Sequence, residues 1–283
     1  MKKISPLLGL LFLFSCSKDQ VQPSAMRIDQ EKLLLPLSFS GYQWTVKNSG
    51  TSREGPGGNY YSKKPANVFV DASGYLHLDI TEKNNKWYCA EVYSKMNFGY
   101  GRYIFVTKGN IEQYDKNIVV GLFTWDDNTY QTDANDELDV EFSKWGHANV
   151  QYVMEYSVQP TYGIGAYPER TNIPQANLVY DGNGFTTHIM DWRSDRVTFE
   201  THTGDDTAAT TLTQSWAFNN TNPPRQANEG GLSDPIVIPA PGTTTKAHIN
   251  FWLFDGNGNG KGDAPSNGLN AELVVKRFQF IPE

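Results

Sequence analysis

Cysteine is scarce in this chain of 283 residues, which contains only Cys16 and Cys89. Two cysteines cannot supply the several disulfides that hold many small exported domains together, so packing must stabilise the core. Basic side chains are also in deficit, with 24 Lys and Arg against 31 Asp and Glu, which gives a formal net charge of −7. This sign argues against nucleic acid and strongly anionic polymers as partners.

The apolar run at the start of the chain is too short to span a bilayer as a helix. Residues 4–14 follow two lysines and have the length and flanking charge of an export signal. The run ends at Cys16 in a Leu-Phe-Ser-Cys sequence, which resembles the lipobox of bacterial lipoproteins. We expect residues 1–15 to be a signal peptide and Cys16 to carry the lipid; an ordinary secretory signal with a chance cysteine is the alternative.

Residues 16–35 are polar and show no sustained period, which is typical of a tether between a membrane and a folded domain. The Ser-Lys-Asp sequence directly after Cys16 resembles the tail of surface-exported lipoproteins in the Bacteroidetes. We therefore expect a protein of the cell envelope, lipid-anchored in the outer membrane at its periplasmic face or at the cell surface. The folded domain is expected over residues 36–283, as a monomer.

No long stretch has the apolar spacing of a helix, and strands do not alternate with helices. Short alternating runs separated by turn residues predict an all-β sandwich instead. Residues 68–71 and 75–80 flank an Ala-Ser-Gly turn and predict a β-hairpin. Further strands are expected at about 90–106, 117–125, 136–143, 149–158, 185–192, 195–202, 247–254 and 271–280. Residues 204–245 are rich in Thr, Asn, Pro and Gly and predict a long loop or insertion.

The run over residues 136–142 carries the clearest chemical signal, because successive side chains of a strand point to opposite faces. Three apolar residues share one face and three carboxylates share the other: Leu138, Val140 and Phe142 against Glu137, Asp139 and Glu141. Since the apolar face belongs in the core, the carboxylates form a row with neighbours roughly 7 Å apart. Like charge raises the pKa of at least one member if the site is desolvated, which separates an acid from an ionised nucleophile. The alternative is a solvated acidic face.

The spacing of this row requires a curved sheet if two of its carboxyls act together. The catalytic carboxyls of a retaining glycosidase lie about 5–5.5 Å apart. Residues i and i+4 of a flat strand have Cα atoms about 13 Å apart. We therefore expect Glu137 and Glu141 to lean toward each other over Asp139, on a concave face that also forms the sugar-binding cleft.

The carboxylate run resembles the active-site strand of family 16 glycoside hydrolases, and the chain is most similar to their lichenase and laminarinase types. Further segments that resemble the family occur in the family's order over roughly residues 60–280. They are Cys89–Ser94, Phe98–Tyr103, Gly121–Trp125, Val150–Tyr152, Phe185–Trp192, Asp195–Phe199 and Asn250–Trp252.

This resemblance implies a jelly-roll, concanavalin A-like β-sandwich of two curved antiparallel sheets. It implies Glu137 as nucleophile, Glu141 as general acid and base, and Asp139 as the group that tunes the nucleophile. The residues that it implies in the sugar subsites are Glu91, Gln151 and Asn250, by hydrogen bonds, and Trp252, by stacking. Trp125 and Trp145 flank the run and are further candidates for stacking, and a structural position in the core is the alternative for each tryptophan.

Some positions depart from the lichenase type. Tyr93 stands in place of an arginine, Val153 in place of an asparagine, and Thr186 with His188 in place of a histidine and a tyrosine. These departures affect which sugar is recognised and leave the carboxylates unchanged. Cys89 matches a family cysteine that is often in a disulfide; because its one possible partner is Cys16, we expect a buried free thiol.

Residues 255–263 alternate Asp, Asn and Gly like the first half of an EF-hand calcium loop. Position twelve of such a loop is Ser266 here rather than a bidentate glutamate, so a flexible glycine-rich turn (Asp255–Asp263) at the rim of the cleft is favoured. We expect the reaction to need no metal or organic cofactor, and structural calcium in this loop is the alternative.

Together these features predict a retaining endo-β-glycosidase that hydrolyses internal bonds of a β-linked polysaccharide, a glucan or a galactan, by double displacement. A non-catalytic surface glycan-binding protein of the same fold and a transglycosylase are the alternatives. A polysaccharide lyase on a similar jelly roll is disfavoured, because an acidic strand is a poor site for uronates.

Overall fold

The structure is a computed structural model that describes residues 36–129, 134–161, 170–219, 225–228, 231–235 and 238–283. The compact unit that contains them spans Pro36–Glu283. The expected signal peptide, the lipid site at Cys16 and the tether lie outside the described residues.

Strands dominate the described residues, as the alternating runs predict. They are β1 (Leu37–Phe39), β2 (Tyr42–Val46), β3 (Tyr60–Tyr61), β4 (Val68–Val70), β5 (Leu76–Lys83), β6 (Lys86–Ser94), β7 (Gly101–Lys108), β8 (Ile118–Trp125), β9 (Leu138–Ser143), β10 (Met154–Val158), β11 (Thr171–Asn172), β12 (Phe185–Trp192), β13 (Arg196–Thr203), β14 (Leu212–Asn219), β15 (Arg225–Asn228), β16 (Gly231–Pro235), β17 (Lys246–Leu253) and β18 (Ala271–Pro282). Short 3₁₀ turns occur at η2 (Ile111–Gln113), η3 (Ala134–Asp136) and η5 (Ala209–Thr211). Within the described ranges, no helix has the length and apolar character needed to cross a membrane.

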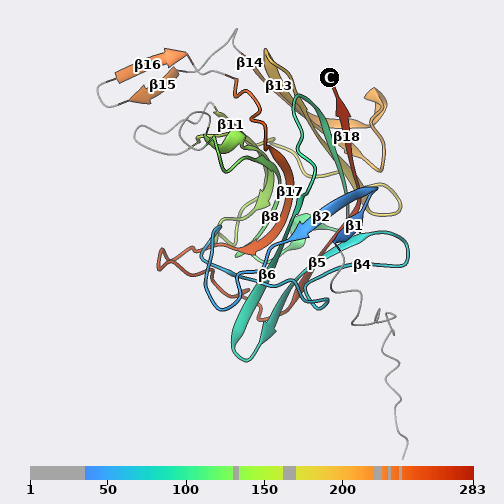
Figure 1. Cartoon of the computed structure of the whole chain (residues 1–283), viewed down its shortest axis with the longest axis vertical. Helices are drawn as coiled ribbons and strands as arrows, with labels where there is room; N and C mark the ends of the chain where they lie inside the picture. Colours follow the sequence, from blue (N-terminus) through green and yellow to red (C-terminus); the bar gives the residue numbers. More distant parts are fainter. Residues whose placement is uncertain (1–35, 130–133, 162–169, 220–224, 229–230, 236–237) are drawn as a thin grey trace, which may run out of the picture. The chain divides into compact units, whose positions relative to one another are not determined.

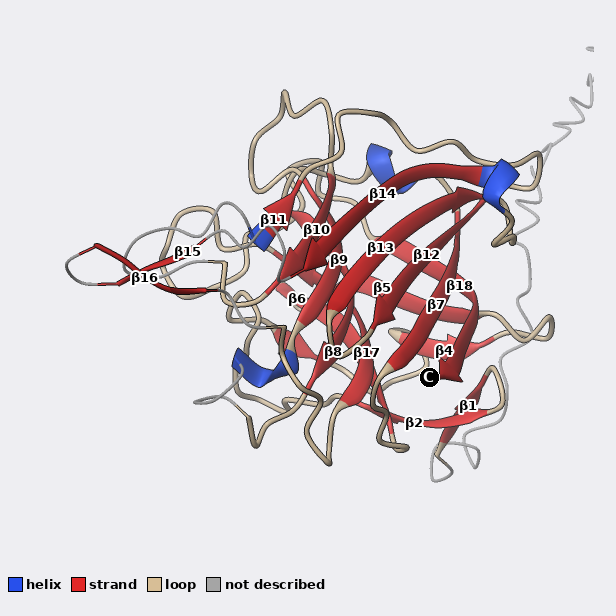
Figure 2. Ribbon diagram, turned by 90° about the horizontal axis from the view of Figure 1, so that it is seen from above, coloured by secondary structure: helices blue, strands red, loops and turns tan. Residues whose placement is uncertain are grey.

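The strands form two layers that the β5–β6 hairpin connects. The first layer has the order β11-β10-β9-β8-β17-β6, with β2 and β1 beyond β6. The second has the order β4-β5-β18-β7-β12-β13-β14. In Figure 2, β12, β13 and β14 lie in front of β8 and β9. Figure 1 shows that β8 and β17 are strongly bent, so the first layer is curved. The predicted jelly-roll β-sandwich of curved antiparallel sheets is confirmed.

Aromatic side chains connect the two layers across the core. Tyr156 of β10 stacks on Phe199 of β13 at a centroid distance of 5.2 Å. Trp44 of β2 meets Phe278 of β18 edge-on, also at 5.2 Å. Burying such large rings between two sheets is the main source of stability in a sandwich without disulfides.

The prediction of a long loop over residues 204–245 is wrong in part, because β14 pairs with β13 along its whole length. Only Trp216 and Phe218 are large apolar residues that β14 packs against the core cluster. Four of the other six residues are polar, namely Thr213, Gln214, Ser215 and Asn219, so the strand shows little of the apolar alternation that marks a strand. An edge strand pairs on one side only and tolerates such a sequence.

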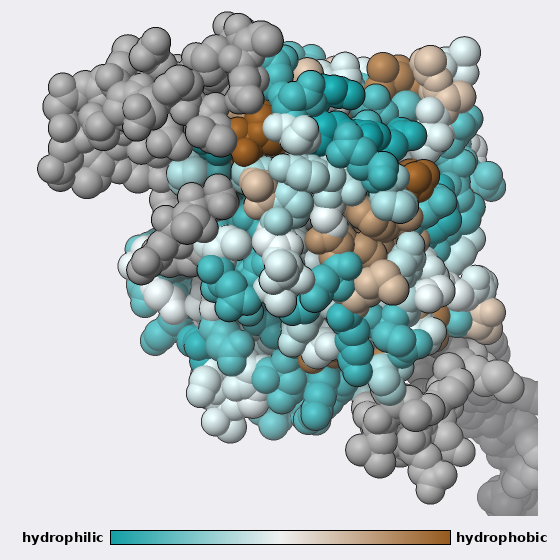
Figure 3. Space-filling view, turned by 45° about the horizontal axis from the view of Figure 1, so that its top comes forward, coloured by the Kyte–Doolittle hydropathy of each residue, from teal (hydrophilic) through white to brown (hydrophobic). Residues whose placement is uncertain are grey.

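The surface seen in Figure 3 is mostly hydrophilic, with small hydrophobic patches between polar residues. Large apolar side chains that are exposed in the described residues are scattered along the chain: Met96, Ile173, Val179, Leu212, Leu269 and Ile281. On the described part of this face, a partner would therefore meet polar groups rather than one extended apolar patch.

Candidate active site

Five neighbouring strands bring one residue each into a single row across the face of the first layer that points away from the core. Glu141 of β9 pairs with Glu155 of β10 on one side and with Gly121 of β8 on the other. Gly121 pairs in turn with Asn250 of β17, and Asn250 with Glu91 of β6. Directly paired residues of antiparallel strands project from the same face. We call this face, with its row, the cleft face.

The alternation expected along the carboxylate run is confirmed. The apolar residues Leu138, Val140 and Phe142 lie in the core cluster. Asp139 is buried and Glu141 half-buried on the opposite, cleft face. Since β9 begins at Leu138, the half-buried Glu137 stands directly before the strand.

A strained turn precedes Glu137 and places it at the start of β9. Asn135 and Asp136 have φ angles of 66° and 55°, in the left-handed region that non-glycine residues adopt at a cost. The Asp136 carboxylate accepts hydrogen bonds from the backbone N–H of Gly242 at 2.6 Å and the hydroxyl of Thr245 at 2.9 Å. These contacts hold the turn in place. Strain that a structure maintains in this way is typical of functional sites.

Burial and like charge raise the pKa values of all three carboxyls in the run. For Glu137, burial is the main cause and the charges of Asp139 and Glu141 add to it. For Asp139, burial raises the pKa to about 7, although a hydrogen bond from Gln159 Nε2 at 3.0 Å acts in the opposite direction. For Glu141, burial acts first, followed by the charges of Asp139 and Glu155. Burial and like charge therefore favour the retention of protons within the group, and an acid and nucleophile pair requires that one member keeps its proton while another is ionised.

Glu91 is the centre of a charged network that the sequence did not indicate. Its carboxylate accepts hydrogen bonds from Lys47 Nζ at 2.8 Å and pairs with His248 Nδ1 at 3.2 Å. Burial would raise the pKa of Glu91, but the hydrogen bond to His248 and the charge of Lys47 outweigh it and lower the pKa. The His248 ring stacks on Tyr93 at 5.2 Å. Both oxygens of Glu91 are thus engaged, so Glu91 positions Lys47 and His248 at the cleft face.

Gly121 leaves room for the side chain of Asn250. A Cβ atom at Gly121 would collide with the Asn250 amide, so only glycine allows this approach. Asn250 Oδ1 and the indole Nε1 of Trp252 are both buried and have no hydrogen-bond partner among the described residues. Buried polar atoms normally have a partner. These two atoms therefore mark places where a ligand hydroxyl or a water molecule can bind.

The other residues predicted to bind sugar lie in different surroundings, and one of them, Gln151, lies away from the row. Trp252 is only 7% exposed and contacts Trp145 at a centroid distance of 6.3 Å. Trp145 is half-buried just beyond β9. Trp125 ends β8 and donates from Nε1 to Asp127 at 2.8 Å. Gln151 lies in an exposed bend before β10 and donates to the Tyr152 hydroxyl, so it is not brought into the row.

Sequence reasoning missed Lys47, Glu155 and His248. His248 stands two residues before Asn250 on one strand, so the alternation that placed Asn250 would also have found it. Glu155 lies within a predicted strand, but only the cross-strand register places it opposite Glu141. Lys47 reaches Glu91 across 44 residues and has no local signal.

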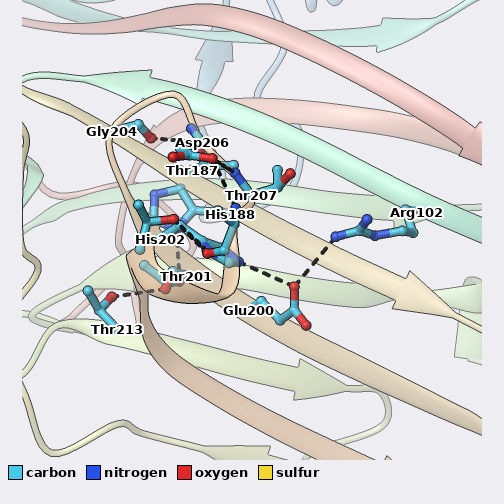
Figure 4. Close-up of polar contacts among 12 residues, drawn as sticks. Arg102, Thr187, His188, Glu200, Thr201, His202, Gly204, Asp206, Thr207 and Thr213 are labelled. Carbon is cyan, nitrogen blue, oxygen red and sulfur yellow. Dashed lines mark hydrogen bonds and ion pairs between the residues drawn. The ribbon is translucent and has the colours of Figure 1, made fainter.

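Behind β9, buried polar side chains of the second layer are bonded to one another (Figure 4). His188 Nδ1 lies 3.1 Å from Thr201 Oγ1, and His188 Nε2 lies 3.0 Å from Thr186 Oγ1. Thr201 Oγ1 also bonds the Tyr156 hydroxyl at 2.6 Å. Burial lowers the pKa of His188 to about 3, and the charge of nearby His202 acts in the same direction. His188 is therefore neutral, and it lies in the core rather than on the cleft face.

The glycine-rich turn Asp255–Asp263 uses its carboxylates to hold its own backbone. Asp255 accepts hydrogen bonds from the N–H groups of Asn259 and Gly260 at 3.0 and 2.7 Å. Asp263 Oδ2 accepts one from Gly256 at 3.1 Å. No group of His, Cys, Asp and Glu side chains suited to a metal ion occurs in the described ranges.

Cys89, in β6, is a fully buried free thiol, and burial raises its pKa to about 12.

Comparison with known proteins finds similarity in the structure and not in the sequence. No protein-family model and no curated protein matches the sequence. A β-glucanase of Bacillus licheniformis is 21% identical at a TM-score of 0.54, and the match covers 85% of this chain and 92% of that one. A glycoside hydrolase family 16 endo-glucanase of Bacteroides ovatus is 14% identical at a TM-score of 0.53, over 84% of this chain and 94% of its own. At such identities the matches establish a common fold.

A third solved structure has a different description. It is an immunostimulatory antigen and pseudo β-1,3-glucanase of Mycobacterium tuberculosis, 17% identical at a TM-score of 0.55, and the match covers 85% of this chain and 91% of that one. The same fold thus occurs in proteins described as glucanases and in one described as a pseudo-glucanase. The activity of this chain has to be argued from its own site.

Proposed function

We propose that this chain is a retaining endo-β-glycosidase of the family 16 type that hydrolyses internal bonds of a β-linked glucan. One observation carries the proposal: Glu137, Asp139 and Glu141 line one face of a curved sheet, and their pKa values are raised together. Among the described residues, no ion pair neutralises any of the three. Burying like charges without a counter-ion costs stability, and strongly perturbed carboxyls of this kind are concentrated at functional sites.

The proposed reaction is a double displacement. Glu141 gives its proton to the glycosidic oxygen as that bond breaks, while the Glu137 carboxylate forms a bond to the anomeric carbon. In the second step Glu141 takes a proton from water, whose oxygen displaces Glu137 and releases the sugar. Asp139 stands between the two glutamates in the sequence, is buried, and accepts a hydrogen bond from Gln159. Its role in the proposal is to adjust the charge on Glu137.

A neutral glucan is the proposed substrate class, and a neutral β-galactan is the second choice. The cleft face carries more acidic than basic groups. Its described cations include Lys47, which is bound to Glu91, and Lys246, which lies over the Tyr93 ring, so the excess of acids would repel an anionic polysaccharide. Proteins described as a β-glucanase and as an endo-glucanase share the fold over most of their length. We expect an endo mode of action, because the first layer is curved and a concave sheet face can accommodate the middle of a polymer chain.

The test measures reducing ends released by the purified protein from a panel of β-glucans and β-galactans, with Glu137→Gln beside it. Release by the wild type, with loss in the variant, is expected. Proton NMR of the first product should show the same anomeric configuration as the substrate. Binding to a polysaccharide without cleavage would favour the glycan-binding alternative. Longer products in the presence of added oligosaccharide would favour transglycosylation.

We also propose that the protein is exported and lipid-anchored at Cys16 in the outer membrane, as the Leu-Phe-Ser-Cys sequence suggests. Cell fractionation tests this: the wild type should remain with the outer membrane, whereas Cys16→Ala should be released or retained as precursor. Recovery of the wild type in the soluble fraction would reject the anchor.

The proposed chemistry uses two carboxyl groups and needs no metal. Dialysis against a chelator should leave the rate unchanged. If the rate or the melting temperature falls and calcium restores it, the turn Asp255–Asp263 becomes the first place to look for the ion.

A further inference from the structure

Glu155 is a fourth carboxylate in the row, and the proposed reaction does not use it. It lies on β10 directly opposite Glu141 on β9. Directly opposed residues of an antiparallel pair have Cβ atoms about 4.5–5.5 Å apart, and like charges there destabilise a sheet. The two glutamates therefore cannot both be ionised without a penalty, and one of them holds a proton more tightly than an isolated glutamate would.

The groups on the face of Glu141 are carboxylates or neutral groups, apart from His248 and Lys47, which are bound to Glu91, and Lys246, which lies over the Tyr93 ring. They are Glu137 and Asp139 on the same run, Glu155 on β10, Gly121 and Phe123 on β8, and Asn250 and His248 on β17, with Glu91 and Lys47 beyond. Lys47 and His248 are both held by Glu91. In the described part of the chain, no cation pairs with Glu141. Burial is the largest cause of its raised pKa, and the charges that add to it are those of its carboxylate neighbours Asp139 and Glu155.

The two opposed glutamates differ in their hydrogen bonds. Glu155 Oε1 accepts a hydrogen bond from the hydroxyl of Ser157 at 3.1 Å. Such a donor favours the ionised form of the acceptor. The described residues offer no corresponding donor to Glu141. When the pair carries one negative charge, the charge therefore resides on Glu155 and the proton on Glu141.

We propose that Glu155 is a positioning residue that keeps Glu141 protonated for the first step of the proposed hydrolysis. Glu155 forms and breaks no bond itself. Its negative charge keeps the proton on Glu141 until the glycosidic oxygen accepts it. In the second step the same charge makes ionised Glu141 a stronger base toward water. This inference rests on the proposed function, because it assigns Glu155 a role in that reaction.

The first experiment compares the pH profiles of kcat/KM for the wild type, Glu155→Gln, Glu155→Asp and Glu82→Gln. Glu82 is exposed in the β5–β6 hairpin, so Glu82→Gln removes one carboxylate away from the row. Without the charge of Glu155, Glu141 loses its proton at lower pH. We expect Glu155→Gln to lose about tenfold in kcat/KM on the alkaline limb and much less at the acid end.

Glu155→Asp should retain a profile close to that of the wild type, and Glu82→Gln should match the wild type over the whole range. A Glu155→Gln pH profile with the wild-type shape would overturn the proposal, whatever the absolute value of kcat/KM. A purely structural role lowers the rate equally at all pH values. Complete loss of activity at every pH would also overturn it, since Glu155 would then be part of the reacting machinery.

A second measurement does not depend on hydrolysis. Glutamate carboxyl carbons are labelled with ¹³C in the full-length protein and titrated by NMR, and the Glu141 signal is identified by its absence in Glu141→Gln. Glu141 should ionise at a lower pH in Glu155→Gln than in the wild type. An unchanged Glu141 titration rejects the inference even if glucan is cleaved. A shifted titration in a protein that cleaves no polysaccharide confirms the pairing and rejects the proposed function instead.

Discussion

Buried polar groups on the two sides of β9 differ in whether they have hydrogen-bond partners. On the core side, both ring nitrogens of His188 are bonded, and Thr201 Oγ1 serves His188 and Tyr156 together. On the cleft face, Asn250 Oδ1 is buried without a described partner and Glu141 faces a like charge. Orphaned polar atoms and opposed carboxylates cost stability, whereas satisfied networks do not. The bonded polar groups on the core side therefore serve the fold, and the unpaired ones on the cleft face are available to a ligand.

The largest expected effect comes from removing the acid on the cleft face. Glu141→Gln should lower kcat for glucan hydrolysis by about 10²–10⁴-fold, the usual contribution of general acid and base catalysis. A carboxyl whose pKa is raised by folding favours the folded state at low pH and weakens it as pH rises above about 4.3. The variant should therefore melt at a higher temperature than the wild type at pH 8. Full activity, or a lower melting temperature at pH 8, would contradict the assignment.

On the core side, Thr201→Val should cost stability and leave the chemistry intact. The substitution keeps the shape of the side chain but leaves His188 Nδ1 and the Tyr156 hydroxyl unpaired. Two such losses amount to about 2–4 kcal/mol of the free energy of unfolding, measured by urea denaturation. Thr198→Val, at a half-exposed position of the same strand β13, is the control and should change the free energy by less than about 0.5 kcal/mol. Equal effects of the two substitutions would show that the hydrogen bonds of Thr201 do not stabilise the core.

The pH dependence of stability should identify His188 as a buried neutral histidine. Its pKa of about 3 in the folded protein lies below the unfolded value of about 6.5. Between these values the unfolded state binds the extra proton, so the His188 contribution to stability falls as pH decreases, by at most about 1.4 kcal/mol per pH unit.

The raised pKa values of the cleft carboxyls act in the opposite direction, so the measurement is a difference. The free energy of unfolding of the wild type minus that of His188→Gln should decrease from pH 6.5 to pH 4.5. A difference that is independent of pH would show that His188 takes up its proton in the folded state as readily as in the unfolded one.

A smaller effect is expected at Asn250. Asn250→Ala removes an amide that can bond a sugar hydroxyl, which should lower kcat/KM about tenfold through KM with little change in stability. Gly121→Ala should lower kcat/KM similarly, because its Cβ displaces the Asn250 amide. In the double variant the two losses should not add, since one side chain is the target of both changes. Additive losses would show that Gly121 acts independently of Asn250.

Much of the carboxylate strand could be predicted because its information is local. The alternation of Leu138, Asp139 and Val140 fixes which side chains enter the core, whatever the neighbouring strands are. The same logic failed for β14, whose polar sequence looks like a loop until it is paired with β13. It also placed a strand at 149–158, whereas β10 begins only at Met154, which leaves Gln151 in an exposed bend.

The sequence by itself determined the class of fold, the two faces of β9 and the row of carboxylates, because a period of two residues is a local property. Only the tertiary structure decided that Glu155 lies opposite Glu141, that Glu91 binds Lys47 and His248, and that His188 lies in the core. These contacts join strands far apart in the chain. They depend on register and curvature, which arise only when all strands of both layers pair and pack together.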